Sequence, residues 1–188
     1  YDWTGVSTLV DLGGGVGASC LHVLSENKTV TSATVLEVQD VVDKAKDLQE
    51  VHLDQFGREN MSRLNYTVGD IFNVDTYPIA DAYMLKNIIH DWNDQECDTL
   101  LQNVSKHLKG DATKRLLVVE KIVQPDKLQP RKAGHDIIKL AFFHEHAKHR
   151  DVSSFGDMFS RNGFKLTKVQ PLLDTDYYVI EGRLDVSN

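Results

Sequence analysis

Short apolar runs alternate with segments in which apolar residues recur every three or four positions along most of this chain. The runs predict β-strands at 9–12, 33–36, 64–68, 80–85 and 116–119. Apolar residues at helical spacing follow the first two runs, at Leu21, Val23 and Leu24 and then at Val41, Val42, Ala45 and Leu48. Strands that alternate with helices indicate an α/β fold with a mostly parallel sheet and helices on both faces.

The clearest helix lies between the fourth and fifth predicted strands. Asn93 is suited to cap its first turn, while Glu96 at the third helical position can reach back to the backbone of the cap. An apolar stripe follows at Cys97, Leu100, Leu101, Val104 and Leu108. We expect Gly110 to end this helix.

The last third of the chain begins with a segment, 124–132, whose prolines and charges suggest an exposed connection. A helix is expected over about 152–161, with Asp151 as its cap. Two strands, 164–169 and 177–180, are predicted to complete the chain as a hairpin-like pair.

Composition limits the classes of protein to which the chain can belong. Its 188 residues are enough for one sizeable core, so we expect one domain over 1–188. A hydrophobic content of 41% and a charged content of 26% are ordinary for a globular protein, and the sequence has no apolar stretch approaching the roughly 20 residues of a membrane span. The formal net charge of −7 argues against tight binding to phosphate backbones. Nucleic acid and membrane are therefore not expected as partners.

Two cysteines, Cys20 and Cys97, each lie in an apolar periodic segment and not in a Cys-x-x-Cys pair. Buried free thiols are expected in preference to a disulfide or a zinc site. No secretory signal pattern follows Tyr1. These features favour a reducing compartment, and we expect a cytoplasmic protein.

A glycine-rich loop over 11–17 joins the first strand to the first helix. Backbone without side chains lets a ligand approach closely, and the helix N-terminus offers free N–H groups, so a nucleotide-like ligand is expected. The same loop also satisfies a dinucleotide-binding fingerprint, and a purely structural turn stays open. Glu37, about 20 residues beyond the loop at the end of the second strand, can accept hydrogen bonds from ribose hydroxyls, with Asp40 as its rival.

Asp70 follows the third strand. Its carboxylate can accept a hydrogen bond from an adenine amino group, while Ile71 or Phe72 covers the ring. A local Asx-turn is the alternative explanation of Gly69-Asp70.

The segment 85–94, Leu-Lys-Asn-Ile-Ile-His-Asp-Trp-Asn-Asp, carries a more specific signal. It resembles the motif that ends the fourth strand in the caffeate, flavonoid and acetylserotonin O-methyltransferases and their bacterial and fungal relatives. Five further segments are similar to that family in the same order, at 10–17, 35–42, 69–72, 116–120 and 160–164. The resemblance therefore covers nearly the whole chain.

The resemblance implies a Rossmann-like class I methyltransferase fold, with seven strands of which the last is antiparallel. It implies S-adenosyl-L-methionine as cofactor, S-adenosyl-L-homocysteine as product, and no metal. Carried over by position, the cofactor-binding residues are Gly14 at the methionine end, Glu37 at the ribose, Asp70 and Ile71 at the adenosine, and Lys86 from the fourth strand.

The resemblance also implies that His90 is the catalytic base and Glu120 its orienting partner. The cofactor already carries the activated methyl group, so the protein must chiefly align and deprotonate a hydroxyl of the acceptor. By analogy with the family, the acceptor is expected to be a small aromatic molecule. A packing or capping role for His90 is the alternative. We expect Asp91 to bond the local backbone and Trp92 to line the core or a pocket.

The family pattern breaks in two places. His149 stands where a second orienting glutamate is expected, with Glu145 four residues earlier, and this change puts the reaction rate in doubt. The spacing of His144, His146 and His149 does not fit a metal site, so we expect a solvated basic loop there.

The second departure is the start of the chain at the cofactor domain. Family members carry an N-terminal helical region that dimerises and lends residues to the acceptor pocket, so a homodimer is expected for a longer protein. The chain could equally be a fragment or naturally short. Two rival functions stay open, a catalytically silent cofactor-binding module and, from the glycine loop alone, a nicotinamide-dependent oxidoreductase.

Overall fold

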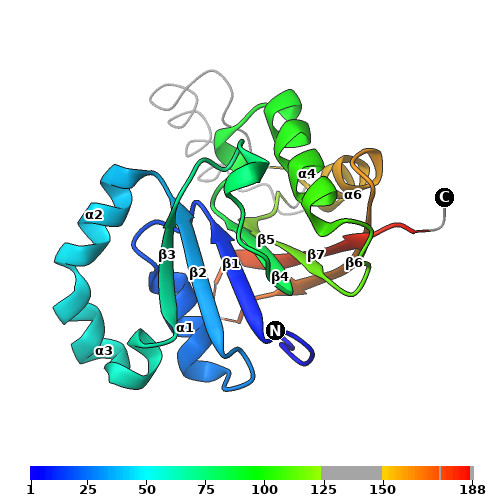
Figure 1. Cartoon of the computed structure of the whole chain (residues 1–188). Coiled ribbons are helices and arrows are strands. Elements are labelled where there is room, and N and C mark those ends of the chain that lie inside the picture. Colours follow the sequence, from blue (N-terminus) through cyan, green and yellow to red (C-terminus); the bar gives the residue numbers. More distant parts are fainter. Residues whose placement is uncertain (124–149, 174, 187–188) are drawn as a thin grey trace, which may run out of the picture.

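The computed structural model describes residues 1–123, 150–173 and 175–186, and these form one seven-stranded sheet with helices on both faces (Figure 1). The strands are β1 (Thr8–Leu12), β2 (Ser32–Glu37), β3 (Leu64–Val68), β4 (Ala82–Lys86), β5 (Arg115–Lys121), β6 (Phe164–Pro171) and β7 (Tyr177–Leu184). The α-helices are α1 (Ala18–Glu26), α2 (Gln39–Asp47), α3 (Gln49–Met61), α4 (Asp94–Leu108) and α6 (Val152–Arg161). Two 3-10 helices are η1 (Val74–Thr76) and η2 (Ile89–Asp91).

The strands lie in the order β3-β2-β1-β4-β5-β7-β6. Neighbours from β3 through β5 are parallel, and β7 is antiparallel to both β5 and β6. This confirms the predicted α/β fold with an antiparallel last strand. The strand order reverses between β1 and β4, which is where open α/β sheets bind ligands, beyond the carboxyl ends of their strands.

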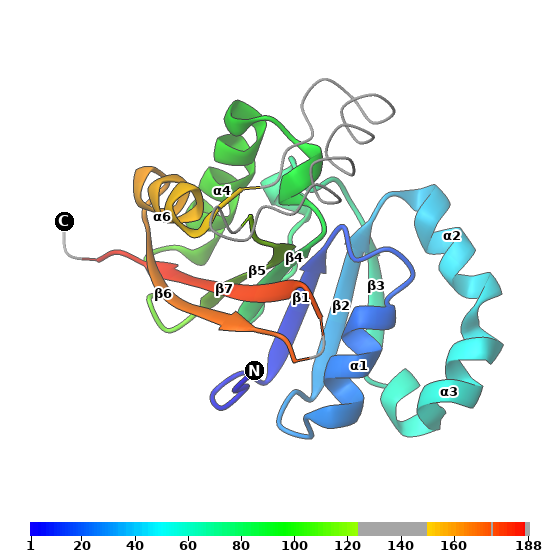
Figure 2. The same cartoon turned by 180° about the vertical axis from the view of Figure 1, so that it is seen from behind.

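Each face of the sheet has its own apolar core. Helices α4 and α6 cover one face, with Leu100, Leu101 and Phe159 fully buried. Helix α1, part of α3 and the N-terminal segment around Trp3 cover the other face, which lies toward the viewer in Figure 2. Because residues alternate along a strand, each strand sends side chains to both cores, and this explains the continuous apolar runs in the sequence.

The predicted caps are present in the structure. Asn93 Oδ1 accepts from the Glu96 N–H at 2.9 Å, and the Asn93 N–H donates to Glu96 Oε2 at 3.0 Å, so both halves of the capping box of α4 form. Asp151 accepts from the Ser154 N–H at the start of α6. Helix α4 ends at Leu108 with Lys109 as its C-cap at φ 51°, and the predicted Gly110 follows directly with φ 80°.

Helix α3 was not predicted. Two of its apolar residues, Val51 and Leu53, are exposed, whereas the polar residues His52 and Asn60 are buried. Because apolar residues are exposed and polar residues are buried, the sequence of α3 does not show the helical period of apolar residues that would have predicted it. Gly57, with φ 78°, interrupts the helical backbone inside it.

Two expectations from composition can be compared with the structure. Cys20 and Cys97 are both free and buried, as predicted. In the described part of the chain, no helix is long and apolar enough to cross a membrane. The connection predicted over 124–132 lies outside the described residues.

Candidate active site

Four loops meet at the carboxyl ends of β1 to β4. The Gly13 N–H donates to the Leu36 carbonyl at 2.9 Å, and the Gly69 N–H donates to the Glu37 carbonyl at 2.9 Å, so hydrogen bonds join the loops after β1, β2 and β3. A Cβ at Gly13 would lie 2.6 Å from Cδ1 of Ile88, which belongs to the segment after β4. The predicted site residues of this edge are thus brought together by the sheet.

The glycine loop is built for close backbone packing. Gly13, Gly15 and Gly17 all have φ between 60° and 85°, a region that favours glycine. Glu37 bridges this loop to the end of β2, because its Oε1 accepts from the Gly15 N–H at 3.1 Å and its Oε2 from the Val38 N–H at 3.0 Å. Asp40, the rival carboxylate, is exposed in the first turn of α2.

Asp11 lies directly beneath the loop and is 1% exposed. Its Oδ1 has no hydrogen-bond partner among the residues described, and its Oδ2 lies 3.8 Å from Cys20 Sγ. Burial raises the pKa of Asp11 to about 7, and the charge of Lys86 opposes that rise. Sequence reasoning placed Asp11 in the glycine motif but assigned it no role, although a carboxylate inside a buried apolar run was a signal.

Asp70 lies at the carboxyl end of β3 and is exposed. Its Oδ1 accepts from the Phe72 N–H at 2.8 Å, so the Asx-turn that the sequence left open forms here. The Tyr77 hydroxyl donates to the Ile71 carbonyl and fixes the next residue of this loop. The rings of Phe72 and Trp92 pack edge to face, with centroids 4.8 Å apart, which ties the loop to the segment after β4.

Lys86 ends β4 on the same face of the sheet as Asp11. Its Nζ lies 5.6 Å from the centroid of the Tyr177 ring, and Nζ of Lys121 lies 5.3 Å from the same centroid. Two lysine ammonium groups therefore share one aromatic ring at this edge.

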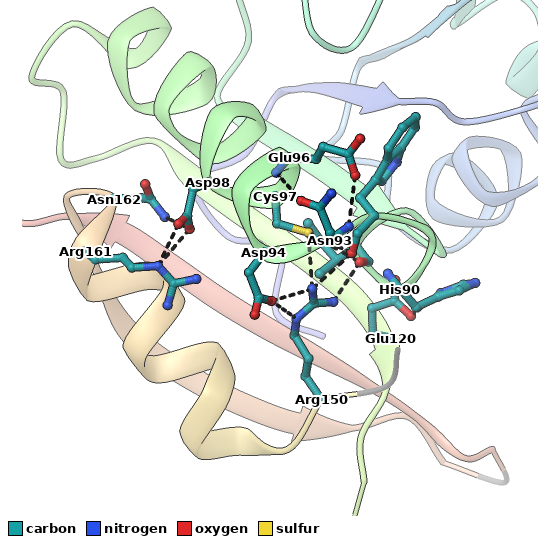
Figure 3. Close-up of polar contacts among 12 residues, drawn as sticks. His90, Asn93, Asp94, Glu96, Cys97, Asp98, Glu120, Arg150, Arg161 and Asn162 are labelled. Atoms are coloured by element: carbon teal, nitrogen blue, oxygen red, sulfur yellow. Dashed lines mark hydrogen bonds and ion pairs between the residues drawn. The ribbon is translucent and has the colours of Figure 1, made fainter. Parts of the chain in front are cut away.

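His90 and Glu120 contact each other on the opposite face of the sheet (Figure 3). His90 Nδ1 lies 2.8 Å from Glu120 Oε2, and the His90 backbone N–H donates to Glu120 Oε1 at 3.3 Å. The Glu120 side chain is 2% exposed and that of His90 is 15% exposed. An ionised carboxylate only accepts hydrogen bonds, so Nδ1 is the donor in this contact whenever Glu120 carries its charge.

Of the residues around His90, Asp91 differs from expectation, and Asn87 was not singled out from the sequence. Asp91 was expected to bond the local backbone, but its Oδ1 lies 3.1 Å from His90 Nε2. Asn87, at the end of β4, has φ 59°, a conformation that asparagine tolerates better than most residues. Sequence reasoning did not single out Asn87, and an Asn directly after a buried strand was the available signal. Trp92 is half-buried and packs against the core, in agreement with the sequence.

No group of three or more His, Cys, Asp or Glu side chains that could hold a metal occurs in residues 1–123, 150–173 and 175–186. Two expectations concern residues outside the described part of the chain. They are the absence of a metal site at His144, His146 and His149, and the replacement of the second orienting glutamate by His149, with Glu145 nearby.

A family model described as an O-methyltransferase domain matches residues 1–165 of this chain. The chain belongs to this O-methyltransferase family. The resemblance seen in the sequence is thereby confirmed.

Curated members of the family are similar along most of the chain. O-methyltransferase 12 of Dictyostelium discoideum is 26% identical over 181 residues, which are 96% of this chain and 45% of that protein. Cephaeline 6'-O-methyltransferase of Carapichea ipecacuanha is 31% identical over 173 residues, 87% of this chain and 43% of that protein. The chain thus spans less than half the length of these relatives.

Solved structures agree on the fold. The mitomycin 7-O-methyltransferase structure aligns with a TM-score of 0.83 and 27% identity, covering 98% of this O-methyltransferase domain and 51% of that chain. Human N-acetylserotonin methyltransferase, in complex with S-adenosylmethionine, aligns with a TM-score of 0.81 and 24% identity, covering 99% and 50% of the two chains. The seven-stranded methyltransferase fold is therefore that of this chain.

Proposed function

We propose that this domain catalyses S-adenosyl-L-methionine-dependent O-methylation of a small aromatic molecule, with His90 as the general base. The observation that carries the proposal is the 2.8 Å contact between His90 Nδ1 and the buried Oε2 of Glu120. A base held by a buried carboxylate beside a glycine-rich cofactor loop is the arrangement that methyl transfer to a hydroxyl needs.

The residues at the carboxyl edge of the sheet fit the cofactor. Gly14 would hold its methionine end, Glu37 the ribose, Asp70 and Ile71 the adenosine, and Lys86 would contact it from β4. Glu37 already reaches the glycine loop through Gly15, and open space surrounds the position of a Cβ at Gly15. Asp11 supports the loop from below, with an Oδ1 that has no hydrogen-bond partner among the described residues.

His90 and Glu120 act on the acceptor. When bound, S-adenosyl-L-methionine supplies a methyl group activated on a sulfonium. Glu120 keeps the proton of His90 on Nδ1, which leaves the lone pair of Nε2 to receive the proton of the acceptor hydroxyl. Asp91, whose side chain is 56% exposed, now faces Nε2, and the acceptor hydroxyl would replace its carboxylate there.

The acceptor and partners belong to the same proposal. Relatives with names such as cephaeline 6'-O-methyltransferase and tabersonine 16-O-methyltransferase support a small-molecule hydroxyl as the substrate. A phenolic hydroxyl has an ordinary pKa of about 10, which an imidazole can deprotonate as the oxygen attacks. We further propose a cytoplasmic location, which the two free buried thiols support, and a homodimer formed through a region outside this chain.

Calorimetric titration with S-adenosyl-L-methionine and S-adenosyl-L-homocysteine tests the cofactor site. We expect micromolar binding that Glu37→Ala and Asp70→Ala each weaken by about tenfold, since each substitution removes a charge-assisted hydrogen bond of about 1.5 kcal/mol. Asp40→Ala is the matched control, because Asp40 is an exposed carboxylate on the neighbouring helix. Absence of binding by the folded chain, or equal effects of all three substitutions, would overturn the assignment.

Methyl transfer to a panel of phenols tests the chemistry. We expect His90→Ala to abolish transfer while the affinity for the cofactor persists, because His90 acts on the acceptor and not on the cofactor. Cofactor binding without transfer by the unaltered protein would instead favour a silent binding module. Binding of NAD in place of S-adenosyl-L-methionine would favour an oxidoreductase.

A further inference from the structure

The segment that carries His90 is short, and its regular structure is a single 3-10 turn. Beyond β4 the backbone passes through the left-handed Asn87 and forms the three-residue helix η2, in which the Asp91 N–H donates to the Ile88 carbonyl at 3.1 Å. The chain then extends at Trp92 before α4 begins. A single short 3-10 turn does not by itself hold a side chain in one place.

The guanidinium of Arg150 holds this segment from the side of β5 and adds to the weaker bonds that Cys97 Sγ donates to the same two carbonyls, at 3.4 and 3.6 Å (Figure 3). Its Nη1 donates to the Ile89 carbonyl at 2.8 Å and its Nη2 to the Trp92 carbonyl at 3.1 Å, so it holds both ends of the turn around His90. Nε and Nη2 also donate to Asp94 Oδ1, at 3.2 and 2.8 Å. The Arg150 side chain is only 2% exposed, so its bonds to the two carbonyls form away from water, whereas the Asp94 side chain is 51% exposed.

Arg150 is itself anchored to the strand that carries Glu120. Its carbonyl accepts from the Val123 N–H at 3.0 Å, and it forms a parallel bridge with Ile122 directly after β5. The next residue, Asp151, caps α6. Arg150 therefore connects the two elements that must be in register for His90 to meet Glu120.

We propose that Arg150 is a positioning residue, which sets the distance and orientation of His90 relative to Glu120 through the backbone of η2. The proposal rests on the function proposed for His90. The bonds of Arg150 within the described part of the chain go to the backbone on either side of His90, to Asp94 and to Cys97, so its effect on methyl transfer would pass through the placement of the imidazole. A planar fork with five N–H donors can reach two carbonyls and a carboxylate together, and the single ammonium of lysine cannot.

The first test needs no acceptor. In protein labelled with ¹⁵N-histidine, NMR reports the tautomer of each of the eight imidazoles, and His90→Gln assigns the His90 signal. We expect Nδ1 of His90 to carry a proton in the unaltered chain, and this preference for Nδ1 to be lost in Arg150→Lys. An unchanged His90 signal in a folded Arg150→Lys protein would overturn the proposal.

Arg161→Lys is the matched control. Arg161 also connects α6 to α4, through bonds of 2.8 and 2.9 Å from its Nε to the Asp98 carboxylate, but it does not contact the His90 segment. Arg161→Lys should leave the His90 signal unchanged. If Arg161→Lys changes the His90 signal as much as Arg150→Lys does, the effect would come from loss of any contact with α4, and the proposal for Arg150 would be wrong. If Arg150→Lys does not fold, Asp94→Asn weakens the same support from its half-exposed side, and an unchanged signal in that variant would also contradict the proposal.

The second test uses methyl transfer. Arg150→Lys should lower kcat by about 10- to 100-fold, the usual cost of misplacing a catalytic group by about 1 Å, with little change in the KM for the cofactor. In a His90→Ala background, Arg150→Lys should have no further effect on the rate, since the positioned group is gone. An additive loss there would show that Arg150 acts by another route. Lack of transfer by the unaltered protein would count against the proposed function alone, because the NMR result stands apart from it.

Discussion

The carboxyl group of Asp11 lies directly beneath Gly14, so that a Cβ on Gly14 would stand 2.6 Å from both Cγ and Oδ2 of Asp11. Asp11 is fully buried and cannot easily move aside. The shape of the glycine loop thus depends on an acidic side chain of the preceding strand.

Gly14→Ala should therefore destabilise the protein and weaken cofactor binding. We expect a loss of about 1–3 kcal/mol in the free energy of unfolding, typical of overpacking, measured by urea denaturation. Gly156→Ala is the control. Gly156 lies inside α6, and a Cβ there would lie 3.9 Å from Leu166 of β6, which is an ordinary van der Waals contact. There alanine should stabilise the helix by about 0.5–1 kcal/mol, and a loss as large as at Gly14 would show that the crowding is not specific.

Asp11 makes stability depend on pH. Its pKa is raised from 3.8 to about 7 by burial, so between these values the folded chain holds a proton that the unfolded chain has released. The contribution of Asp11 to the free energy of unfolding therefore falls as pH rises through this window, by up to about 1.4 kcal/mol per pH unit. Asp11→Asn should gain stability relative to the unaltered protein from pH 4 to 7, in urea titrations at each pH. A difference that is constant with pH would contradict the buried carboxyl.

Glu120→Gln should abolish most methyl transfer without loss of the cofactor. The amide keeps the size of the side chain but removes the charge that stabilises the imidazolium and no longer selects the Nδ1–H tautomer. We expect the rate to fall by at least about 100-fold, with cofactor affinity unchanged by calorimetry. Glu181→Gln is a control, since this carboxylate of β7 is also buried but pairs with Tyr1 and Arg183, away from His90. A comparable loss of rate in that variant would mean that buried charge in general, and not Glu120, supports the reaction.

Asn93→Ala should reduce the free energy of unfolding by about 1 kcal/mol, because it removes the side-chain half of the capping box of α4. Thermal unfolding followed by circular dichroism measures the change. Asn93→Asp, which keeps an acceptor for the Glu96 N–H, should restore most of the stability. Equal losses in both variants would assign the effect to packing and not to the cap.

Local signals predicted much of the fold because they act within a few residues of where they stand. The strand at Leu64–Val68 and the helix Val152–Arg161 lie where the sequence placed them, and Asn93 and Asp151 cap their helices as expected. Helix α3 was missed because its burial does not follow its hydrophobicity: tertiary contacts bury His52 and Asn60 and leave Val51 in solvent.

The candidate site likewise has features that the sequence predicts and features that depend on the tertiary structure. The sequence alone determined the order of the strands and of the described α-helices other than α3, together with the glycine loop, the helix caps and the family that the motifs around Glu37, Asp70 and His90 indicate, because these are encoded in contiguous segments. The resemblance implied that Glu120 pairs with His90, 30 residues away along the chain, and the tertiary structure supplied the geometry of that contact. Only the tertiary structure decided that Arg150 reaches Ile89, 61 residues away along the chain. Likewise, only packing decided that Asp11 is sealed beneath Gly14. Such pairings are set by the order and register of strands in the sheet, and by desolvation once the layers close, which no short stretch of sequence contains.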